Sequence, residues 1–236
     1  MEEQHIASAF DRDLESIRAQ IMKMGGLVEA AIVDAARALE TRDEDLALQV
    51  RERDKVIDAV EELINVEAAR LIAIRSPAAG DLRLVLSVMK IAANLERIGD
   101  YAKNMAKRTL VLVKGPDDLG GASAVRRMSR DVERMLKDAL DAYIQRDVEL
   151  AKDIIARDQD VDQMYSALFR QLLTYMMEDP RNITPCMHLH FIAKNTERMG
   201  DHVTSIAEQV IYLVTGEKPD GARVKADNTS TTILEL

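Results

Sequence analysis

Residues 94–100 read Asn-Leu-Glu-Arg-Ile-Gly-Asp and residues 195–201 read Asn-Thr-Glu-Arg-Met-Gly-Asp, so the chain carries this stretch twice, 101 positions apart. When the windows are widened to residues 91–106 and 192–207, eight of the sixteen positions are identical. A shared run of this length at one offset indicates an internal duplication. We call the repeated stretch the acidic signature, because each copy holds a Glu and an Asp four residues apart.

The composition predicts a helical protein of two similar halves. The 236 residues give room for two units of about 100 residues each. Nearly half of them are hydrophobic and only 3% are aromatic, so the core must be aliphatic. Few residues are Gly or Pro, and Ala, Leu, Glu, Arg and Met are common, which favours helices.

Charge and cysteine usage narrow the function classes. A net charge of −9 argues against direct nucleic-acid binding, which needs a basic face. Cys186 is the only cysteine, so no intramolecular disulfide forms and a reducing compartment is expected. The N-terminal residues are acidic and polar, unlike a signal peptide, and no apolar run approaches the roughly 20 residues of a membrane span. We therefore expect a cytoplasmic protein without membrane insertion.

Apolar residues recur at helical spacing through the first half of the chain. A first helix is predicted from about residue 8 to 40, and Asp43 is predicted to cap a second helix. The second helix has a seam of apolar residues seven apart, and Ser76-Pro77 ends it. A third helix is predicted from about Leu82 to Val113. The seam of the second helix consists of Val50, Ile57, Ile64 and Leu71.

The second half repeats this order after a Gly/Pro-rich break at residues 115–121. Arg146-Asp147 matches Arg42-Asp43 at an offset of 104, and the sixth helix is predicted to end near Thr215. The sequence thus predicts an all-α fold of two tandem three-helix bundles. The expected bounds are 1–114 for the first bundle, 115–121 for the linker, 122–216 for the second bundle and 217–236 for a flexible tail.

The acidic signature is predicted to lie on the outer surface of its helices. At 100° per residue, Glu96 and Asp100 lie about 140° and 180° from the core residue Ile91. Glu197 and Asp201 occupy the same positions relative to Ile192. Two carboxylates four apart repel mildly, and a Gly within a helix costs about 1 kcal/mol relative to Ala. A bound cation and a close backbone contact at Gly99 and Gly200 would compensate these costs.

The second and fifth helices supply a matching set of acids at an offset of 104. If the helices are neighbours, four carboxylates converge in each half, and oxygen-only sites suit hard cations or carboxylate-bridged iron. The alternative is a set of solvated faces, because 41 of the 236 residues are acidic. The candidate metal ligands are Asp54, Asp58, Glu96 and Asp100 in the first half, and Asp158, Asp162, Glu197 and Asp201 in the second.

Residues 96–106 and 197–202 resemble the duplicated Glu-Arg-Ile-Gly-Asp-His motif of the PhoU family, and residues 54–58 resemble a second family motif. The resemblance covers nearly the whole chain up to the tail. It implies two three-helix bundles side by side and, in many members, a homodimer. It also implies metal clusters held by the acidic pairs, with Fe, Mn, Mg or Zn as the candidate ions.

The resemblance further implies a regulatory role without catalysis. Family members act as adaptors between the ATPase of the phosphate ABC transporter and the sensor histidine kinase of the phosphate regulon, and restrain uptake or regulon activity when phosphate is plentiful. Two alternatives remain open. One is a carboxylate-metal enzyme of ferritin-like type, which needs inward-facing Glu-x-x-His pairs that this sequence lacks. The other is an adaptor whose acids only bind basic partner surfaces.

Because of two departures from the family pattern and from a strict repeat, the two sites need not be equivalent. The family often has His after the last Asp of the motif; His202 fits this pattern, whereas Tyr101 replaces it in the first half. The second helix carries Glu61 one turn beyond Asp58, where the fifth helix has Tyr165.

Overall fold

The computed structural model describes residues 2–115 and 120–219, and its regular structure is helical throughout these ranges. A short 3-10 turn, η1 (Pro180–Asn182), separates the last two long helices. The six long helices are α1 (Glu2–Thr41), α2 (Glu44–Arg75), α3 (Ala79–Leu112), α4 (Gly121–Gln145), α5 (Val148–Glu178) and α6 (Ile183–Thr215).

The turns that join α1 to α2 and α4 to α5 have the same construction. Arg42 and Arg146 take left-handed backbone conformations with φ of 55° and 56°. The following aspartate then caps the next helix: Asp43 accepts a hydrogen bond from the Leu46 amide, and Asp147 accepts from the amide of Leu150. The predicted cap at Asp43 is therefore confirmed, and its counterpart recurs 104 residues later.

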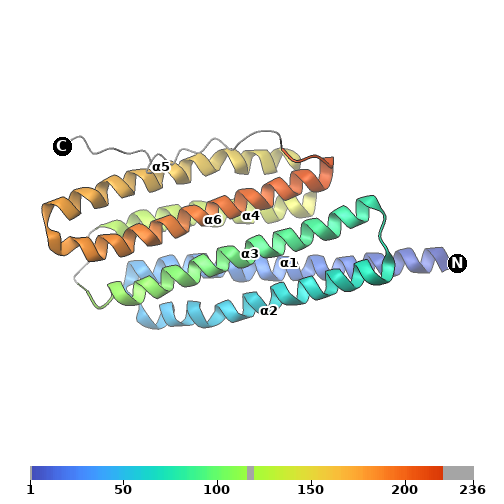
Figure 1. Cartoon of the computed structure of the whole chain (residues 1–236), viewed down its shortest axis with the longest axis horizontal. Coiled ribbons are helices and arrows are strands. Elements are labelled where there is room, and N and C mark those ends of the chain that lie inside the picture. The colour runs from blue at the N-terminus through green and yellow to red at the C-terminus, as the bar shows by residue number, and fades with distance from the viewer. Residues whose placement is uncertain (1, 116–119, 220–236) are drawn as a thin grey trace.

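The helices form two three-helix bundles side by side, as Figure 1 shows. Helices α1, α2 and α3 pack on one another, and α4, α5 and α6 do the same. The bundles meet where α3 packs on α6 and α1 packs on α4, which leaves α2 and α5 at opposite edges. The predicted fold of two tandem three-helix bundles is confirmed.

The core is aliphatic, and the predicted seam of α2 is fully buried. In α5, Ile154, Val161 and Leu168 lie 104 residues after members of the α2 seam and are likewise buried, whereas Leu150 in the first turn is only half-buried. The prediction that α3 begins at Leu82 was three residues late: the helix starts directly after Pro77-Ala78, and Gly80 is accommodated in its first turn.

Some expectations concern residues outside the described ranges. Most of the linker, residues 116–119, and most of the tail, residues 220–236, lie there. Helix α6 ends at Thr215 as predicted, and Gly216 with φ of 82° caps it. None of the helices that the structure describes contains an apolar stretch long enough to cross a membrane.

Candidate functional site: two acidic sites between paired helices

The first acidic site lies between α2 and α3. Asp54 is buried, Asp58 is exposed, and Glu96 and Asp100 are half-buried. Asp58 and Asp100 lie close enough to contribute to the raised pKa of both Asp54 and Glu96. The four residues that the sequence placed in one set are therefore brought together.

Lys103 neutralises the buried end of this site. Its Nζ lies 2.5 Å from Oδ2 of Asp54 and 3.4 Å from Oδ1 of Asp100. Burial raises the pKa of Asp54, and the Lys103 ammonium opposes that rise. The hydrogen bond to Asp54 in turn raises the pKa of Lys103 and keeps the ammonium charged. The site thus already holds one positive charge from the protein.

Glu96 is the group in the first site that titrates near neutral pH. Burial, followed by repulsion from Asp100, raises the pKa of Glu96 to about 7, and Arg97 works against this rise. Arg97 lies 3.7 Å from Glu96 and 3.8 Å from Asp100, but it is itself 62% exposed, so solvent screens both ion pairs. A cation at this site would therefore compete with protons close to pH 7.

The second acidic site lies between α5 and α6 and is more enclosed. Asp158, Asp162 and Glu197 are buried, and Asp201 is half-buried. Burial raises the pKa of Glu197, with smaller contributions from Asp201 and Asp162, while Lys194 lowers it. Three buried carboxylates in one site are costly unless positive charge compensates them.

Lys194 supplies that positive charge. Its Nζ donates to Oε1 of Glu197 at 2.9 Å, and the ammonium lies 4.8 Å from the centre of the Tyr165 ring. Tyr165 on α5 is equivalent in the repeat to Glu61 on α2; the tyrosine is buried and the glutamate is half-buried. An aromatic ring therefore closes the second site, whereas a carboxylate leaves the first one open. The two sites are therefore not equivalent.

The prediction that the acidic signature lies on an outer surface is wrong for Glu197, which is only 2% exposed. A helical wheel with a single core direction places this glutamate in solvent. Helix α6 packs against α3, α4 and α5, and these neighbours extend its buried arc beyond Ile192 as far as Glu197. Glu96 and Asp100 are half-buried rather than fully exposed for the same reason, since α3 packs against α1, α2 and α6.

The two signature glycines permit close contact between paired helices. A Cβ atom on Gly200 would lie 2.6 Å from Oδ1 of Asp158, a distance that real side chains do not tolerate. A Cβ atom on Gly99 would lie 3.1 Å from Cδ1 of Ile57 and 3.7 Å from Oδ1 of Asp54. The close backbone approach expected at these glycines is present at both sites and is tighter at the second.

We expect Gly200→Ala to destabilise the protein by about 1–2 kcal/mol, because displacement of the Asp158 carboxylate outweighs the gain in helix propensity. Gly99→Ala should change stability by less than about 1 kcal/mol, since the tip of Ile57 can shift. The matched control is Gly26→Ala on α1, which meets nothing within 4 Å and should stabilise by about 0.5–1 kcal/mol. Urea unfolding of the three variants measures this order, and equal effects at Gly200 and Gly26 would contradict it.

The donor set of each site suits a hard cation, but the ligands are not arranged around one. Among residues 2–115 and 120–219, no three His, Cys, Asp or Glu side chains lie in an arrangement that could hold a metal ion. Lys103 and Lys194 lie where a cation would be attracted. Both are long side chains with part of their surface in solvent, at 40% and 27% exposure, so they are able to move aside. Coordination would require them to do so.

The two lysines are the site residues that the sequence analysis did not identify. Lys103 lies three residues after Asp100, and Lys194 lies three residues before Glu197, so each contacts its acid along one helix face. Neither lysine is repeated in the other half, where the residues at the 101-residue offset are Thr204 and Ala93. A search for a base three residues from each acid would have found both.

The two signature helices also contact each other across the bundle interface. Nδ1 of His202 lies 2.8 Å from Oδ1 of Asn94, and the His202 ring packs on Tyr101 with 5.6 Å between ring centres. The hydroxyl of Thr196 contacts the sulfur of Met105 at 3.6 Å. The two acidic sites are thus joined by a direct α3–α6 contact.

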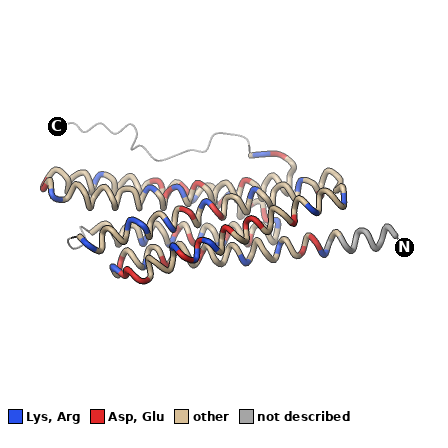
Figure 2. The backbone as a smooth tube through the Cα atoms, turned by 60° about the horizontal axis from the view of Figure 1, so that its bottom comes forward, with Lys and Arg blue, Asp and Glu red and all other residues tan. Residues whose placement is uncertain are grey.

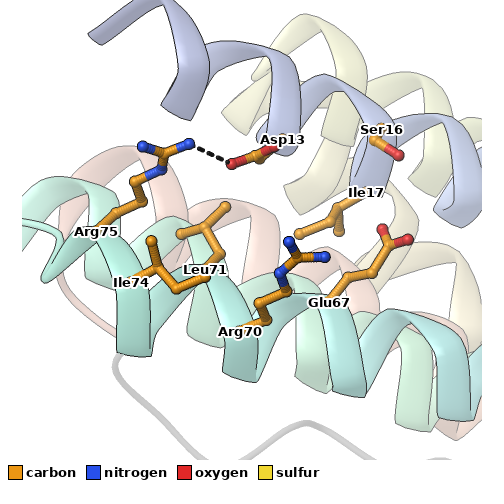
Figure 3. A pocket seen from close by; sticks show the side chains of 8 residues that line it. All are labelled: Asp13, Ser16, Ile17, Glu67, Arg70, Leu71, Ile74 and Arg75. Atoms are coloured by element: carbon orange, nitrogen blue, oxygen red, sulfur yellow. Dashed lines mark hydrogen bonds and ion pairs between the residues drawn. The ribbon is translucent and has the colours of Figure 1, made fainter. Parts of the chain in front are cut away.

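A pocket of about 190 Å³ lies between the start of α1 and the end of α2. Figure 3 shows Arg75 of α2 paired with Asp13 of α1, with a distance of 3.2 Å. Glu67 and Arg70 bring charges of both signs to the same pocket. No predicted metal ligand lines it, so it is separate from the acidic sites.

Comparison with known proteins gives matches along nearly the full chain. The family model described as the PhoU domain matches residues 21–109 and again residues 125–210. A PhoU homologue from Rhizobium meliloti, described as a phosphate-specific transport system accessory protein, is 46% identical over 238 residues and covers 98% of each chain. A protein with the same description from Caulobacter vibrioides is 42% identical, covering 95% of this chain and 97% of its own.

Solved structures agree with these matches. The crystal structure of PhoU from Pseudomonas aeruginosa superposes with a TM-score of 0.85 at 43% identity and covers 88% of this chain and all of that one. The phosphate transport system regulatory protein PhoU from Streptococcus pneumoniae superposes with a TM-score of 0.82 at 29% identity, covering 89% and 99%.

Proposed function

Because this chain belongs to the PhoU family, we propose that it is a non-enzymatic regulator of phosphate uptake and of the phosphate-starvation response. The observation that carries the proposal is the match of both halves to the family model, together with 46% identity over almost the whole length of an accessory protein of phosphate-specific transport. The regulator acts in the cytoplasm as an adaptor between the ATPase of the phosphate transporter and the phosphate-sensing histidine kinase.

Deletion of the gene is expected to derepress phosphate-starvation genes or to deregulate uptake in phosphate-rich medium, since the restraint would be lost. The measurement is a phosphate-starvation reporter together with cellular phosphate content, with a complemented strain as control. Unchanged reporter output and phosphate content in the deletion strain would contradict the regulatory role.

The adaptor role has a separate test. The full-length protein, isolated with its partners from cells grown in high and in low phosphate, should carry the transporter ATPase and the histidine kinase in proportions that change with phosphate. A partner set that is the same in both media would contradict phosphate-dependent adaptor activity.

The acidic sites bind hard cations as part of this role. Support comes from the four carboxylates gathered between each helix pair. It also comes from the raised pKa values of Asp54, Glu96 and Glu197, which burial causes first and neighbouring carboxylates increase. Asp54, Asp58, Glu96 and Asp100 would hold an ion in the first half once Lys103 moves away. Asp158, Asp162, Glu197 and Asp201 would do so in the second once Lys194 moves. An ion there would cross-link two helices of one bundle.

A further inference from the structure

Helix α2 is apolar on two opposite faces. One face is the buried seam of the first bundle. The other carries apolar side chains that point away from the bundle, and its larger members are each at least 43% exposed. An exposed apolar stripe of this length along one helix is typical of an interaction site. Its members are Leu48, Val56, Ala59, Leu63, Val66 and Ile74.

The duplicated helix α5 provides an internal comparison. Residues 104 positions later keep the buried seam, with Ile154, Val161 and Leu168 in the core. The outward positions, in contrast, contain no large aliphatic residue. They read Lys152, Asp160, Gln163, Ala167, Arg170 and Glu178, and all are exposed. The bundle fold therefore does not require an apolar outer face on this helix, and α2 has one for another reason.

The spacing of the α2 stripe is symmetric. With Glu52 and Arg70 included, its positions are separated by 4, 4, 3, 4, 3, 4 and 4 residues, a series that reads the same in both directions about residue 61. Alternating steps of three and four form the seam of helices that pack side by side. Any face of a straight helix has this symmetric spacing about its centre, so the spacing permits antiparallel pairing with an identical helix, and the residue types along the face decide whether such pairing is favourable.

Antiparallel pairing of two α2 helices about residue 61 matches both the apolar and the charged positions. Leu48 would face Ile74 of a second copy, Val56 would face its Val66, and Ala59 its Leu63. The two charged positions of the stripe would also meet, with Glu52 facing Arg70 twice. Opposite charges at this register favour one alignment and disfavour slipped ones.

The surroundings of α2 leave this face accessible. Helix α2 packs mainly on α1 and α3 and lies at the edge of the molecule in Figure 1. In Figure 2, which brings this edge forward, acidic and basic residues are interspersed along the helices instead of forming a face of one sign. Glu52 makes only a solvent-exposed ion pair with Lys55, and Arg70 is exposed beside the α1–α2 pocket, so both can turn to a new partner.

We propose that the outer face of α2 is a two-fold symmetric interface that pairs with α2 of a second copy of this chain, antiparallel and centred on residue 61. The resemblance to the PhoU family implies a homodimer but no particular surface. The exposed apolar residues of α2, together with the opposite charges of Glu52 and Arg70 at matching positions, assign one. This pairing does not depend on the regulatory role or on bound metal.

The test is sedimentation of the full-length protein and surface variants over a range of concentrations. The wild-type protein should form a dimer with a dissociation constant below about 50 µM. Leu63→Glu should weaken the dimer by about 100-fold or more, because it places a carboxylate in each half of an apolar seam. Its matched control is Ala167→Glu, at the equivalent position of α5, which should change the dissociation constant by less than about threefold.

Charge reversal tests the register. Glu52→Arg and Arg70→Glu should each weaken the dimer by about tenfold or more, and the double variant should return close to wild type. The two positions are 18 residues apart on one helix, about 27 Å, so only a second chain can produce this rescue. An equimolar mixture of the two single variants should also associate, since both contacts are then attractive. Circular dichroism checks that each variant is folded.

Three results would overturn the proposal. The first is a wild-type protein that stays monomeric throughout the concentration range, which would leave the stripe to another partner. The second is a dimer that Leu63→Glu and Ala167→Glu affect equally, which would place the interface elsewhere. The third is failure of both the double variant and the mixture to restore association, which would exclude the antiparallel register.

Discussion

Replacing Lys194 by Met is expected to destabilise the protein by about 2–4 kcal/mol at pH 8, because it leaves the Glu197 carboxylate buried without its ammonium partner. The methionine keeps most of the volume of the lysine stem, so the loss comes from charge and not from packing. Lys103→Met should cost less, since the first site is more open to water.

The pH dependence of this loss has a definite sign. The pKa of Glu197 is raised in the folded protein, first by burial, and Lys194 restrains the rise. Without Lys194 the pKa rises further, so the folded state binds more protons than the unfolded state between the ordinary value of 4.5 and the new one. Stability then falls as pH increases through that window, and Lys194→Met should be much closer to wild type at pH 5 than at pH 8.

Urea unfolding at the two pH values measures the effect. The control is the double variant Lys194→Met with Glu197→Gln, in which the charge is absent and most of the stability should return at pH 8. A single variant that is as stable as wild type at pH 8 would show that the buried carboxylate has enough other partners.

Loss of metal from one half at a time is the second large effect that we expect. Glu96→Ala with Asp100→Ala should remove bound metal from the first site alone, because the second site uses separate helices. Glu197→Gln with Asp201→Asn should remove it from the second alone; amides are chosen because Glu197 is buried and a smaller residue would leave a cavity. Elemental analysis after purification without chelator or histidine tag measures the content of each site.

Binding at the first site should weaken as pH falls through about 7, where burial and Asp100 place the pKa of Glu96. Helicity and the melting transition of the Glu96/Asp100 variant serve as the control, since both residues are half-buried and their loss should leave the bundle intact. Full metal content in both double variants, or none in wild type, would contradict the metal assignment.

The fold could be predicted from the sequence because it follows from local patterns. The seam from Val50 to Leu71 and the cap at Asp43 each depend on residues within one helix or turn, and both are confirmed. The internal repeat then predicts two similar three-helix bundles, since two copies of one three-helix unit are expected to fold alike.

The environment of the acids could not be predicted in the same way. The burial of each acid depends on which helices surround it, and the apolar period of a single helix carries no information about those neighbours. Glu96 and Glu197 are equivalent in the repeat, yet one is half-buried and the other almost fully buried. The difference comes from residues outside the repeated identities, such as Tyr165 on the neighbouring helix and Lys194 one turn away.

The turn at Arg42 shows how the two copies have diverged. Its guanidinium donates to three carbonyl oxygens at the end of α3, those of Leu112, Val113 and Gly115, at 3.1, 3.0 and 2.9 Å. Arg146 shares the left-handed backbone, but its charge acts on Tyr143 within its own turn. Two halves that arose as copies have therefore ceased to be interchangeable modules. A chimera assembled from two first halves would have two arginines that each bind the end of a third helix, and both of its acidic sites would be of the open form. Descent from one ancestor therefore no longer implies that the halves can be exchanged.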